Sequence, residues 1–170
     1  MQIKQTFPLT WYALYTKSRH EKFVEAKLLQ KGIEAFTPKI TLRRRWSDRI
    51  KLIENPLFKS YCFARFSLYD KLKTVSQTGV VKIVNFKGQY ISIPDETVNS
   101  LKILINSQIQ LDPCSYIKIN DTVAIKRGPL KGVEGIVLDK RNKNTTLVIS
   151  IDAIESSMQF VVDADCIEAS

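Results

Sequence analysis

The sequence predicts an α+β protein in which an N-terminal mixed sheet with about three helices is joined by a linker to a small SH3-like β-barrel. In residues 8–106 strand-like and helix-like patterns follow one another, as in helices packed on a mixed sheet. Residues 107–116 lose this periodicity and are rich in Gln, Ser, Asp and Pro. Residues 117–170 contain short apolar runs separated by turn residues, as in a small barrel. We therefore expect domains at 8–106 and 117–170, with a linker at 107–116.

The first two elements of the N-terminal domain are a strand and a helix. Residues 11–16, Trp-Tyr-Ala-Leu-Tyr-Thr, are apolar and aromatic, as in a central strand. A helix is expected over 19–31, with Ser18 as N-cap, Glu21 as its capping-box partner and Gly32 as the residue that ends it. Its buried face is expected to carry the apolar residues at helical spacing, namely Phe23, Ala26, Leu28, Leu29 and Ile33.

The rest of this domain is expected to complete the sheet. The chain stays extended from Glu34 to Ile40, forms a basic hairpin around 43–49 and reaches a loop at 55–60. The strand that follows, 61–66, has aromatic residues at every second position, which places them on one face. The remaining elements are a short helix at 69–77, extended chain at 80–86, a turn at 87–89, a short extended piece at 90–93 and a helix opened by Pro94 that runs to about 105.

The C-terminal domain is expected to contain about five strands, at 119–126, 133–139, 145–151, 158–162 and near 166–167. Between the first two lies a turn that combines glycines with a proline, because glycine reaches positive φ without strain and proline fixes its own φ. The pattern resembles a KOW motif, carried by Gly128, Pro129, Leu130, Gly132 and Gly135. KOW motifs occur mainly in transcription elongation factors and ribosomal proteins, which indicates a role with nucleic acids.

The net charge of +9 is concentrated in the first two thirds of the chain. Residues 1–112 carry 19 Lys+Arg against 9 Asp+Glu, a balance of +10, whereas residues 113–170 carry 7 against 8, a balance of −1. A basic domain is attracted to phosphate, and a nearly neutral one suits a protein partner. The charge therefore favours nucleic-acid contact by the N-terminal domain.

Other classes of protein are disfavoured. The apolar runs are too short to span a bilayer and the first residues lack a signal-peptide core, so a cytoplasmic protein without membrane contact is expected. Cys62, Cys114 and Cys166 lack metal-ligand spacing, and His20 is the only histidine. The carboxylates are scattered, so we expect no enzyme, no metal and no cofactor.

Taken together, these segments closely resemble the bacterial NusG family of transcription elongation factors over nearly the whole chain. The resemblance rests on Trp11–Leu14 with the helix bearing Glu21, Asn55–Phe58 leading to Tyr61–Phe63, Gly79–Val81, the run Gly88–Pro94, and the KOW segment Val123–Gly135. The Asn-Pro-Leu-Phe and Tyr-Cys-Phe run is similar to the specialised RfaH and UpxY antiterminators, which act on capsule or surface-polysaccharide operons. Leu130 departs from the family, which usually has phenylalanine there.

The resemblance implies a monomeric factor that binds the clamp helices of the largest RNA polymerase subunit, contacts the non-template DNA strand and increases processivity. The polymerase-binding positions would be Tyr15, Phe36, Pro56, Leu57, Phe58, Tyr61 and Phe63. For Phe63, as for Trp11, a place in the core is favoured over contact; for Leu57 and Phe58, which lie in a loop, exposure is expected.

Two basic clusters are the expected nucleic-acid contacts. Lys17, Arg19 and His20 lie where the first strand meets the first helix, and helix N-terminal amides can also face phosphate there. Arg43, Arg44 and Arg45 precede Trp46, whose indole can stack on a base. For each cluster the alternative is a solvated basic surface.

The KOW domain would bind a protein, either a ribosomal small-subunit protein or a termination factor, and a switch of its fold to a helical hairpin that masks the clamp site stays open. Two other functional classes also stay open. A ribosome-associated KOW protein that binds RNA or protein would explain the glycine-rich turn and the charge, but not the order of the N-terminal motifs. An enzyme fits least.

Overall fold

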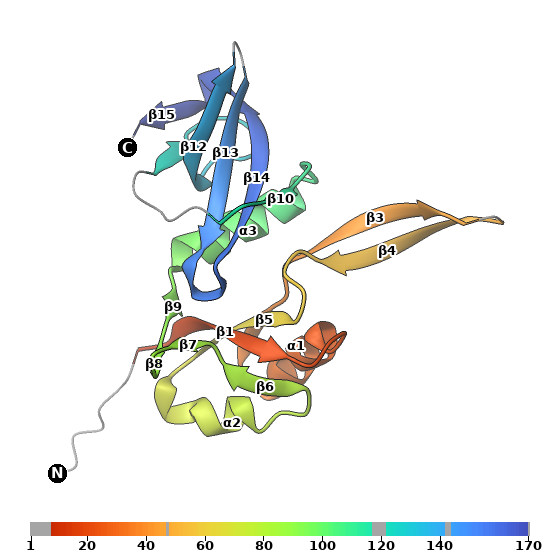
Figure 1. The fold of residues 1–170 in the computed structure, drawn as a ribbon, viewed down its shortest axis with the longest axis vertical. Helices are drawn as coiled ribbons and strands as arrows, with labels where there is room; N and C mark the ends of the chain where they lie inside the picture. The colour runs from red at the N-terminus through yellow and green to blue at the C-terminus, as the bar shows by residue number, and fades with distance from the viewer. Residues whose placement is uncertain (1–7, 47, 117–121, 142–143, 170) are drawn as a thin grey trace. The chain divides into compact units, whose positions relative to one another are not determined.

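The structure is a computed structural model that describes residues 8–46, 48–116, 122–141 and 144–169. It divides into two compact units. Unit 1 comprises 1–37 and 56–93, and unit 2 comprises 38–55 and 94–170. Each unit is described separately below. The mixed α+β class expected from the sequence is confirmed, with helices, an N-terminal sheet and a β-rich C-terminal part (Figure 1).

Unit 1 is built on a five-stranded sheet in the order β2-β5-β1-β6, with β9 also paired to β1. All of these pairs are antiparallel. The central strand β1 is flanked by partners on both edges, which satisfies its backbone groups and allows its side chains to be buried. The strands are β1 (Thr10–Thr16), β2 (Glu34–Phe36), β5 (Tyr61–Phe66), β6 (Val80–Ile83) and β9 (Ser92–Ile93).

One face of this sheet packs against α1 (Glu21–Gln30). Val24 and Leu28 of the helix are fully buried with Leu14, Cys62 and Phe66 of the sheet. Burial of each large aliphatic side chain contributes about 1.5–3 kcal/mol. The buried face differs from the expected one, since Phe23 and Leu29 are largely exposed. The helix is therefore rotated so that its i, i+4 pair Val24 and Leu28, flanked by Glu21, faces the sheet.

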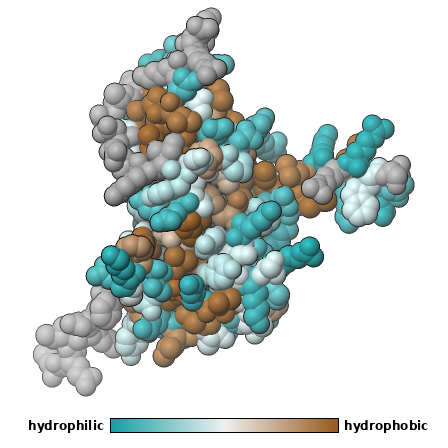
Figure 2. Space-filling model, viewed as in Figure 1, coloured by the Kyte–Doolittle hydropathy of each residue, from teal (hydrophilic) through white to brown (hydrophobic). Residues whose placement is uncertain are grey.

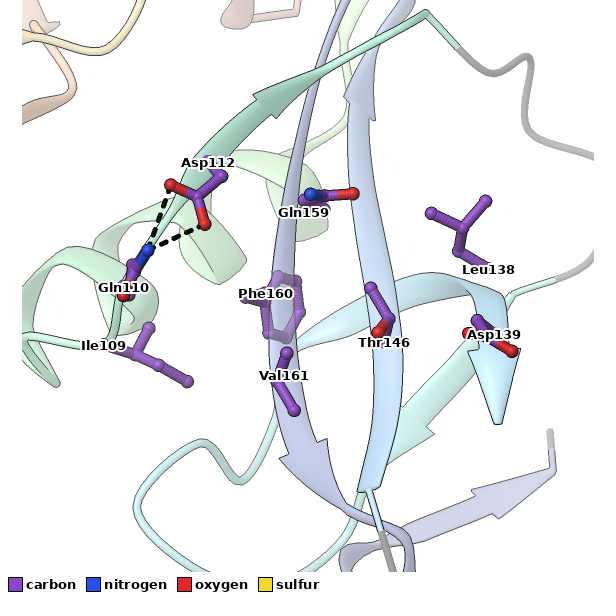
Figure 3. A pocket seen from close by; sticks show the side chains of 9 residues that line it. All are labelled: Ile109, Gln110, Asp112, Leu138, Asp139, Thr146, Gln159, Phe160 and Val161. Atoms are coloured by element: carbon purple, nitrogen blue, oxygen red, sulfur yellow. Dashed lines mark hydrogen bonds between the residues drawn. The ribbon is translucent and has the colours of Figure 1, made fainter. Parts of the chain in front are cut away.

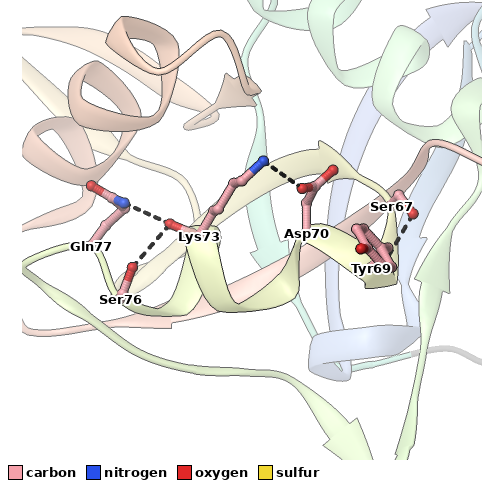
Figure 4. Close-up of polar contacts among 6 residues, drawn as sticks. All are labelled: Ser67, Tyr69, Asp70, Lys73, Ser76 and Gln77. Atoms are coloured by element: carbon pink, nitrogen blue, oxygen red, sulfur yellow. Dashed lines mark hydrogen bonds and ion pairs between the residues drawn. The ribbon is translucent and has the colours of Figure 1, made fainter.

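A short helical segment and a two-stranded hairpin complete unit 1. The 3-10 turn η1 (Leu68–Asp70) and α2 (Lys71–Val75) follow β5, and β7 (Asn85–Phe86) pairs with β8 (Gln89–Tyr90). A five-residue helix has too few internal hydrogen bonds to be stable alone. Figure 4 shows the polar contacts that hold it: Ser67 Oγ accepts from the Tyr69 amide, the Lys73 ammonium pairs with Asp70 at 2.8 Å, and Gln77 donates to the Lys73 carbonyl at 2.6 Å.

Unit 2 contains a two-stranded ribbon, one long helix and a six-stranded antiparallel sheet in the order β10-β14-β13-β12-β11-β15. The ribbon is β3 (Lys39–Arg45) and β4 (Ile50–Pro56), and the helix is α3 (Asp95–Asn106). The sheet strands are β10 (Asp112–Cys114), β11 (Val123–Ile125), β12 (Glu134–Arg141), β13 (Asn144–Ile151), β14 (Ser156–Asp163) and β15 (Ile167–Ala169). Two 3-10 turns, η2 (Asp152–Ile154) and η3 (Ala164–Cys166), connect the last strands.

Helix α3 contacts β12 and β13 within unit 2. The buried Ser100 Oγ accepts a hydrogen bond of 3.0 Å from the Glu134 amide, and a Cβ on Gly132 would lie 3.6 Å from the Ile103 side chain. Val98, Leu101 and Leu104 of α3 are fully buried, whereas Ile103 and Ile105 are partly exposed. The expected opening of this helix after Pro94 is confirmed, with Asp95 and Glu96 in its first turn.

Three details differ from the expectations. Helix α1 begins at Glu21 with His20 as N-cap and no side-chain cap, so Ser18 does not form the expected capping box. The segment expected to be a linker contains β10, which pairs with β14. The extended stretch expected at 80–86 is divided into β6 and β7. Residues 119–121 of the first expected barrel strand lie outside the described residues.

Candidate functional site

Four of the seven predicted polymerase-binding side chains lie on the sheet of unit 1, and Pro56, Leu57 and Phe58 precede β5. Tyr15 is paired with Tyr61 across β1 and β5, and Phe36 is paired with Phe63 across β2 and β5. Because alternate residues of a strand point to opposite faces, these four share a face, opposite to the one that Leu14 and Cys62 present to α1. We call this the aromatic face.

The aromatic face is exposed only in part. Tyr15 is 38% exposed, and Phe36 and Tyr61 are partly exposed. Pro56 and Leu57, which precede β5, are also partly exposed. Phe63 is fully buried, which agrees with the favoured place in the core. Phe58 is only 4% exposed, so the expectation that this loop residue is exposed is wrong.

Tyr15 and Tyr61 are in ring contact on this face. Their rings meet edge to face, with centroids 5.6 Å apart. Burial raises the pKa of Tyr61, and the neighbouring Tyr15 raises it further. Tyr61 is therefore protonated at neutral pH, and its hydroxyl can donate a hydrogen bond at the edge of an apolar surface.

The first basic cluster, which we call the basic turn (Lys17–His20), directly follows β1. The Lys17 amide donates to the Gly79 carbonyl at 2.8 Å, and the His20 amide donates to the Lys17 carbonyl at 3.0 Å. Arg19 has φ +62°, a strained conformation for a residue with a side chain. Lys17 and Arg19 are exposed. Two cationic side chains are thus presented to solvent on a turn whose backbone is fixed.

Gly79 determines the position of this turn. Its φ is +98°, and a Cβ at this residue would lie 3.0 Å from Val24 Cγ2 and 3.2 Å from His20 Cβ. Only glycine allows so close an approach of the 79–80 backbone to the start of α1. The His20 ring is further oriented by a 3.0 Å hydrogen bond between Nδ1 and the Ser18 carbonyl.

The second basic cluster lies at the end of the β3–β4 ribbon, in unit 2. Arg43, Arg45 and Trp46 are exposed, the indole by 52%, and the side chain of Arg44 lies outside the described part. The Lys51 ammonium lies 5.3 Å from the centre of the Trp46 ring. Figure 2 shows hydrophilic and hydrophobic side chains interspersed along this ribbon. The exposed hydrophobic residues there are Leu42, Trp46, Ile50 and Leu52.

The expected KOW motif forms the turn between β11 and β12. Gly128 and Gly132 have φ +80° and +91°, which explains glycine at both positions. A Cβ on Gly135 would lie 3.0 Å from the Val148 carbonyl oxygen, so glycine lets β12 approach β13. Pro129 is exposed. Leu130 is buried.

A cavity of about 500 Å³ in the C-terminal sheet was not foreseen from the sequence. Figure 3 shows its lining: Ile109, Gln110, Asp112, Leu138, Asp139, Thr146, Gln159, Phe160 and Val161. The Gln110 amide donates to both carboxylate oxygens of Asp112, at 3.2 and 3.0 Å. Leu138 and Val161 are about half exposed. Apolar residues that point outward from a strand are the sequence feature that could have indicated this cavity.

The comparisons identify the family. The family model described as "Transcription termination factor nusG" matches residues 9–102, more than half of the chain. The chain belongs to the NusG family. The match spans β1 to most of α3, and so includes every predicted polymerase-binding and nucleic-acid-binding residue of this NusG-family chain.

Two solved structures align with most of this chain. A structure entitled "Domain interaction in Thermotoga maritima NusG" has 19% identity and a TM-score of 0.48, with 95% of this chain and 97% of that chain covered. A structure entitled "Crystal Structure of MjSpt4:Spt5 complex conformation B" has 16% identity and a TM-score of 0.31, with 94% and 95% covered. No curated protein matches.

The family membership makes this chain a NusG-type transcription factor. Among the described residues, no helix is long and apolar enough to cross a membrane. In the same part of the chain, no three His, Cys, Asp or Glu side chains gather as a metal site.

Proposed function

We propose that this chain is a transcription elongation and antitermination factor. It binds the clamp helices of the largest RNA polymerase subunit through the aromatic face, contacts the non-template DNA strand through its basic clusters and increases processivity. It acts at specific operons of the surface-polysaccharide type. The observation that carries the proposal is the arrangement around the end of β1, where the partly exposed Tyr15 is separated by one residue from the basic turn.

The aromatic face supports the polymerase contact. Tyr15 and Tyr61 are rigid side chains that combine apolar area with a hydroxyl, a type common at the centre of protein interfaces. Phe36, Leu57 and Pro56 add partly exposed apolar surface. Truncation of one such central aromatic residue typically costs about 2 kcal/mol of binding free energy, which corresponds to about thirtyfold in affinity.

The basic turn supports the DNA contact. Lys17 and Arg19 are exposed and held on a fixed backbone, so little conformational entropy is lost from the turn when it binds phosphate. The ribbon adds Arg43, Arg45 and Trp46, a combination of cations and an exposed indole suited to phosphates and unstacked bases.

The mechanism requires no bond making or breaking. A factor that binds the closed, processive polymerase more tightly than the paused one shifts the population towards the processive state by that difference in affinity. Simultaneous contact with the polymerase and with the exposed DNA strand makes the second contact intramolecular and increases the overall affinity.

The C-terminal β-rich part is proposed to bind a protein partner, either a ribosomal small-subunit protein or a termination factor. The support is its net charge of −1 over residues 113–170, because a nearly neutral surface does not attract phosphate. Its cavity has half-exposed Leu138 and Val161 at the rim, which are compatible with a protein contact.

The test is binding of the full chain to core RNA polymerase, with Tyr15→Ala and Arg19→Ala compared with wild type. We expect Tyr15→Ala to weaken binding by about thirtyfold. Arg19→Ala should keep its affinity for core polymerase and lose affinity for a transcription complex with an exposed non-template strand. Tyr69→Ala is the matched control, because Tyr69 is 82% exposed and belongs to η1, outside the aromatic face.

Equal binding by all of these proteins would contradict the assignment of roles. Co-sedimentation with ribosomes, together with no binding to polymerase, would favour the alternative of a ribosome-associated protein.

A further inference from the structure

Glu21 carries a buried carboxylate that the proposed contacts do not use. It is the first residue of α1 and is only 6% exposed. Its Oε1 accepts a hydrogen bond of 2.7 Å from the Ser60 amide, and its main-chain carbonyl accepts one of 3.3 Å from the Thr37 hydroxyl. A carboxylate is costly to bury unless a donor satisfies it, and here the Ser60 amide does so.

The residue that Glu21 holds has an unusual backbone. Ser60 has φ +64°, in the left-handed region that residues with a Cβ rarely occupy. Both of its main-chain polar groups are engaged, since its amide donates to Glu21 and its carbonyl accepts from the Thr16 amide at 2.8 Å. A strained residue persists where its surroundings hold it, and here two hydrogen bonds do so.

The strained residue determines the course of the loop that carries the predicted polymerase contacts. The Tyr61 amide donates to the Phe58 carbonyl at 3.3 Å, which closes a turn around Ser60. Phe58 is buried on one side of this turn, whereas Leu57 stays partly exposed. On the other side, Tyr61 enters β5 and meets the Tyr15 ring. The conformation at Ser60 thus decides which of these side chains faces outward.

The same hydrogen bonds connect the loop to the basic turn. Thr16 donates to Ser60, and the next residue, Lys17, donates to the Gly79 carbonyl at 2.8 Å. Glu21 lies directly after His20, the last residue of the basic turn. One carboxylate is therefore adjacent in the chain to the basic turn and hydrogen-bonded to the loop of the aromatic face.

We propose that Glu21 is a positioning residue for polymerase binding: through the Ser60 amide it fixes loop 56–60 so that Leu57 and Tyr61 are presented together with Tyr15. This inference rests on the proposed function, because it concerns the same surface. Glu21 itself is buried and does not touch the partner. It acts on the unbound protein by holding the loop in the conformation that binds polymerase. A surface that is preformed in this way loses less free energy to conformational ordering on binding.

The experiment combines substitutions at both ends of the hydrogen bond in the full chain. Glu21→Ala removes the acceptor, Glu21→Gln keeps an acceptor oxygen without the charge, and Ser60→Gly removes the Cβ that disfavours positive φ. The affinity for core RNA polymerase is measured at a temperature where thermal unfolding curves show every variant to be folded. Exchange of the Ser60 amide with deuterium is followed by NMR.

We expect Glu21→Ala to weaken polymerase binding by about tenfold, the effect of losing one hydrogen bond to a charged group, and to accelerate Ser60 amide exchange. Glu21→Gln should retain most of the affinity. Ser60→Gly should restore most of the lost affinity in the Glu21→Ala background. A role in overall stability alone would not change the affinity of a folded protein.

Ser67→Ala is the matched control. Ser67 is also a buried residue of unit 1 whose side chain accepts from a main-chain amide, that of Tyr69 at 3.2 Å, and it is not part of the aromatic face. We expect its loss to leave polymerase affinity unchanged.

The outcomes separate the two proposals. If wild type binds polymerase and Tyr15→Ala weakens binding, but Glu21→Ala binds as wild type does, the positioning role is wrong and the proposed function stands. Failure of Ser60→Gly to restore binding in the Glu21→Ala background would also overturn the positioning role. If wild type does not bind polymerase at all, both are overturned.

Discussion

The Phe58 ring lies 5.9 Å from the Phe63 ring, tilted by 43°, and both side chains are buried. A residue that the loop sequence suggested as an exposed contact is therefore part of the hydrophobic core. Its contribution is to stability, and the proposed contact surface is left to the partly exposed Leu57 and Tyr61.

Phe58→Ala should lower the free energy of unfolding by about 3–5 kcal/mol, because it removes a buried ring and leaves a cavity. Tyr15→Ala should cost much less, because Tyr15 is 38% exposed. Urea denaturation of the two variants and wild type checks this. A loss below about 1 kcal/mol for Phe58→Ala would show that its ring does not belong to the core.

Gly79→Ala should destabilise the protein more than Gly88→Ala. Both glycines have positive φ, which alone costs an alanine about 1 kcal/mol. Nothing lies within 4 Å of a Cβ on Gly88, whereas one on Gly79 would crowd Val24 and His20. The difference in unfolding free energy between the two variants therefore measures the packing of the basic turn. Equal effects would indicate that this turn can move away freely.

The stability of the protein should fall with rising pH through the ionisation of Cys62. Burial raises the pKa of its thiol to about 12, from 9.0. Above pH 9 the thiol ionises in the unfolded chain but not in the folded one, so unfolding becomes favoured by up to about 1.4 kcal/mol per pH unit until pH approaches 12. Below pH 9 this contribution is constant.

Denaturation of wild type and Cys62→Ala at several pH values between 8 and about 10.5 isolates this effect, since other titrating groups are common to both proteins. The stability advantage of wild type over the variant should shrink as pH rises. A pH-independent difference would mean that the thiol is hydrated in the folded protein.

Removing two charges from the ribbon should change the salt dependence of nucleic-acid binding. For Arg43→Gln with Arg45→Gln we expect the slope of log affinity against log salt to fall by about 1.4, which is about 0.7 per phosphate contact on single strands. Fluorescence anisotropy with a single-stranded oligonucleotide measures it. Lys126→Gln with Lys131→Gln removes the same charge from the C-terminal domain and should leave the slope unchanged. Equal slopes in both variants would mean that only net charge matters.

The sequence predicted those elements whose residues carry a local signal. The alternating aromatics of 61–66 gave β5, the glycines of the KOW-type turn occur at positive φ or at a close approach, and Pro94 opened α3. Helical periodicity located α1 but did not predict which of its faces packs on the sheet. The helix has more apolar residues than the sheet can cover.

The candidate site was less predictable, because it depends on contacts between distant parts of the chain. The sequence predicts a local capping role for Glu21, yet its side-chain partner is Ser60, 39 residues away. Positive φ at a serine has no sequence signature, and Phe58 follows a proline and a leucine in a loop without periodicity. Tertiary packing determines both the backbone conformation of Ser60 and the burial of Phe58.

The β3–β4 ribbon is joined at its base by the ion pair between Lys39 and Glu54, at 3.6 Å, and at its far end by the bond from the Trp46 amide to the Arg49 carbonyl, at 2.8 Å. A hairpin of this kind can gain or lose residues in matched pairs near its tip while its base keeps the same register. Its reach and its charge can therefore diverge between related factors without any rearrangement of the buried core, which makes it a natural place for target preference to evolve and a practical place to graft a new one.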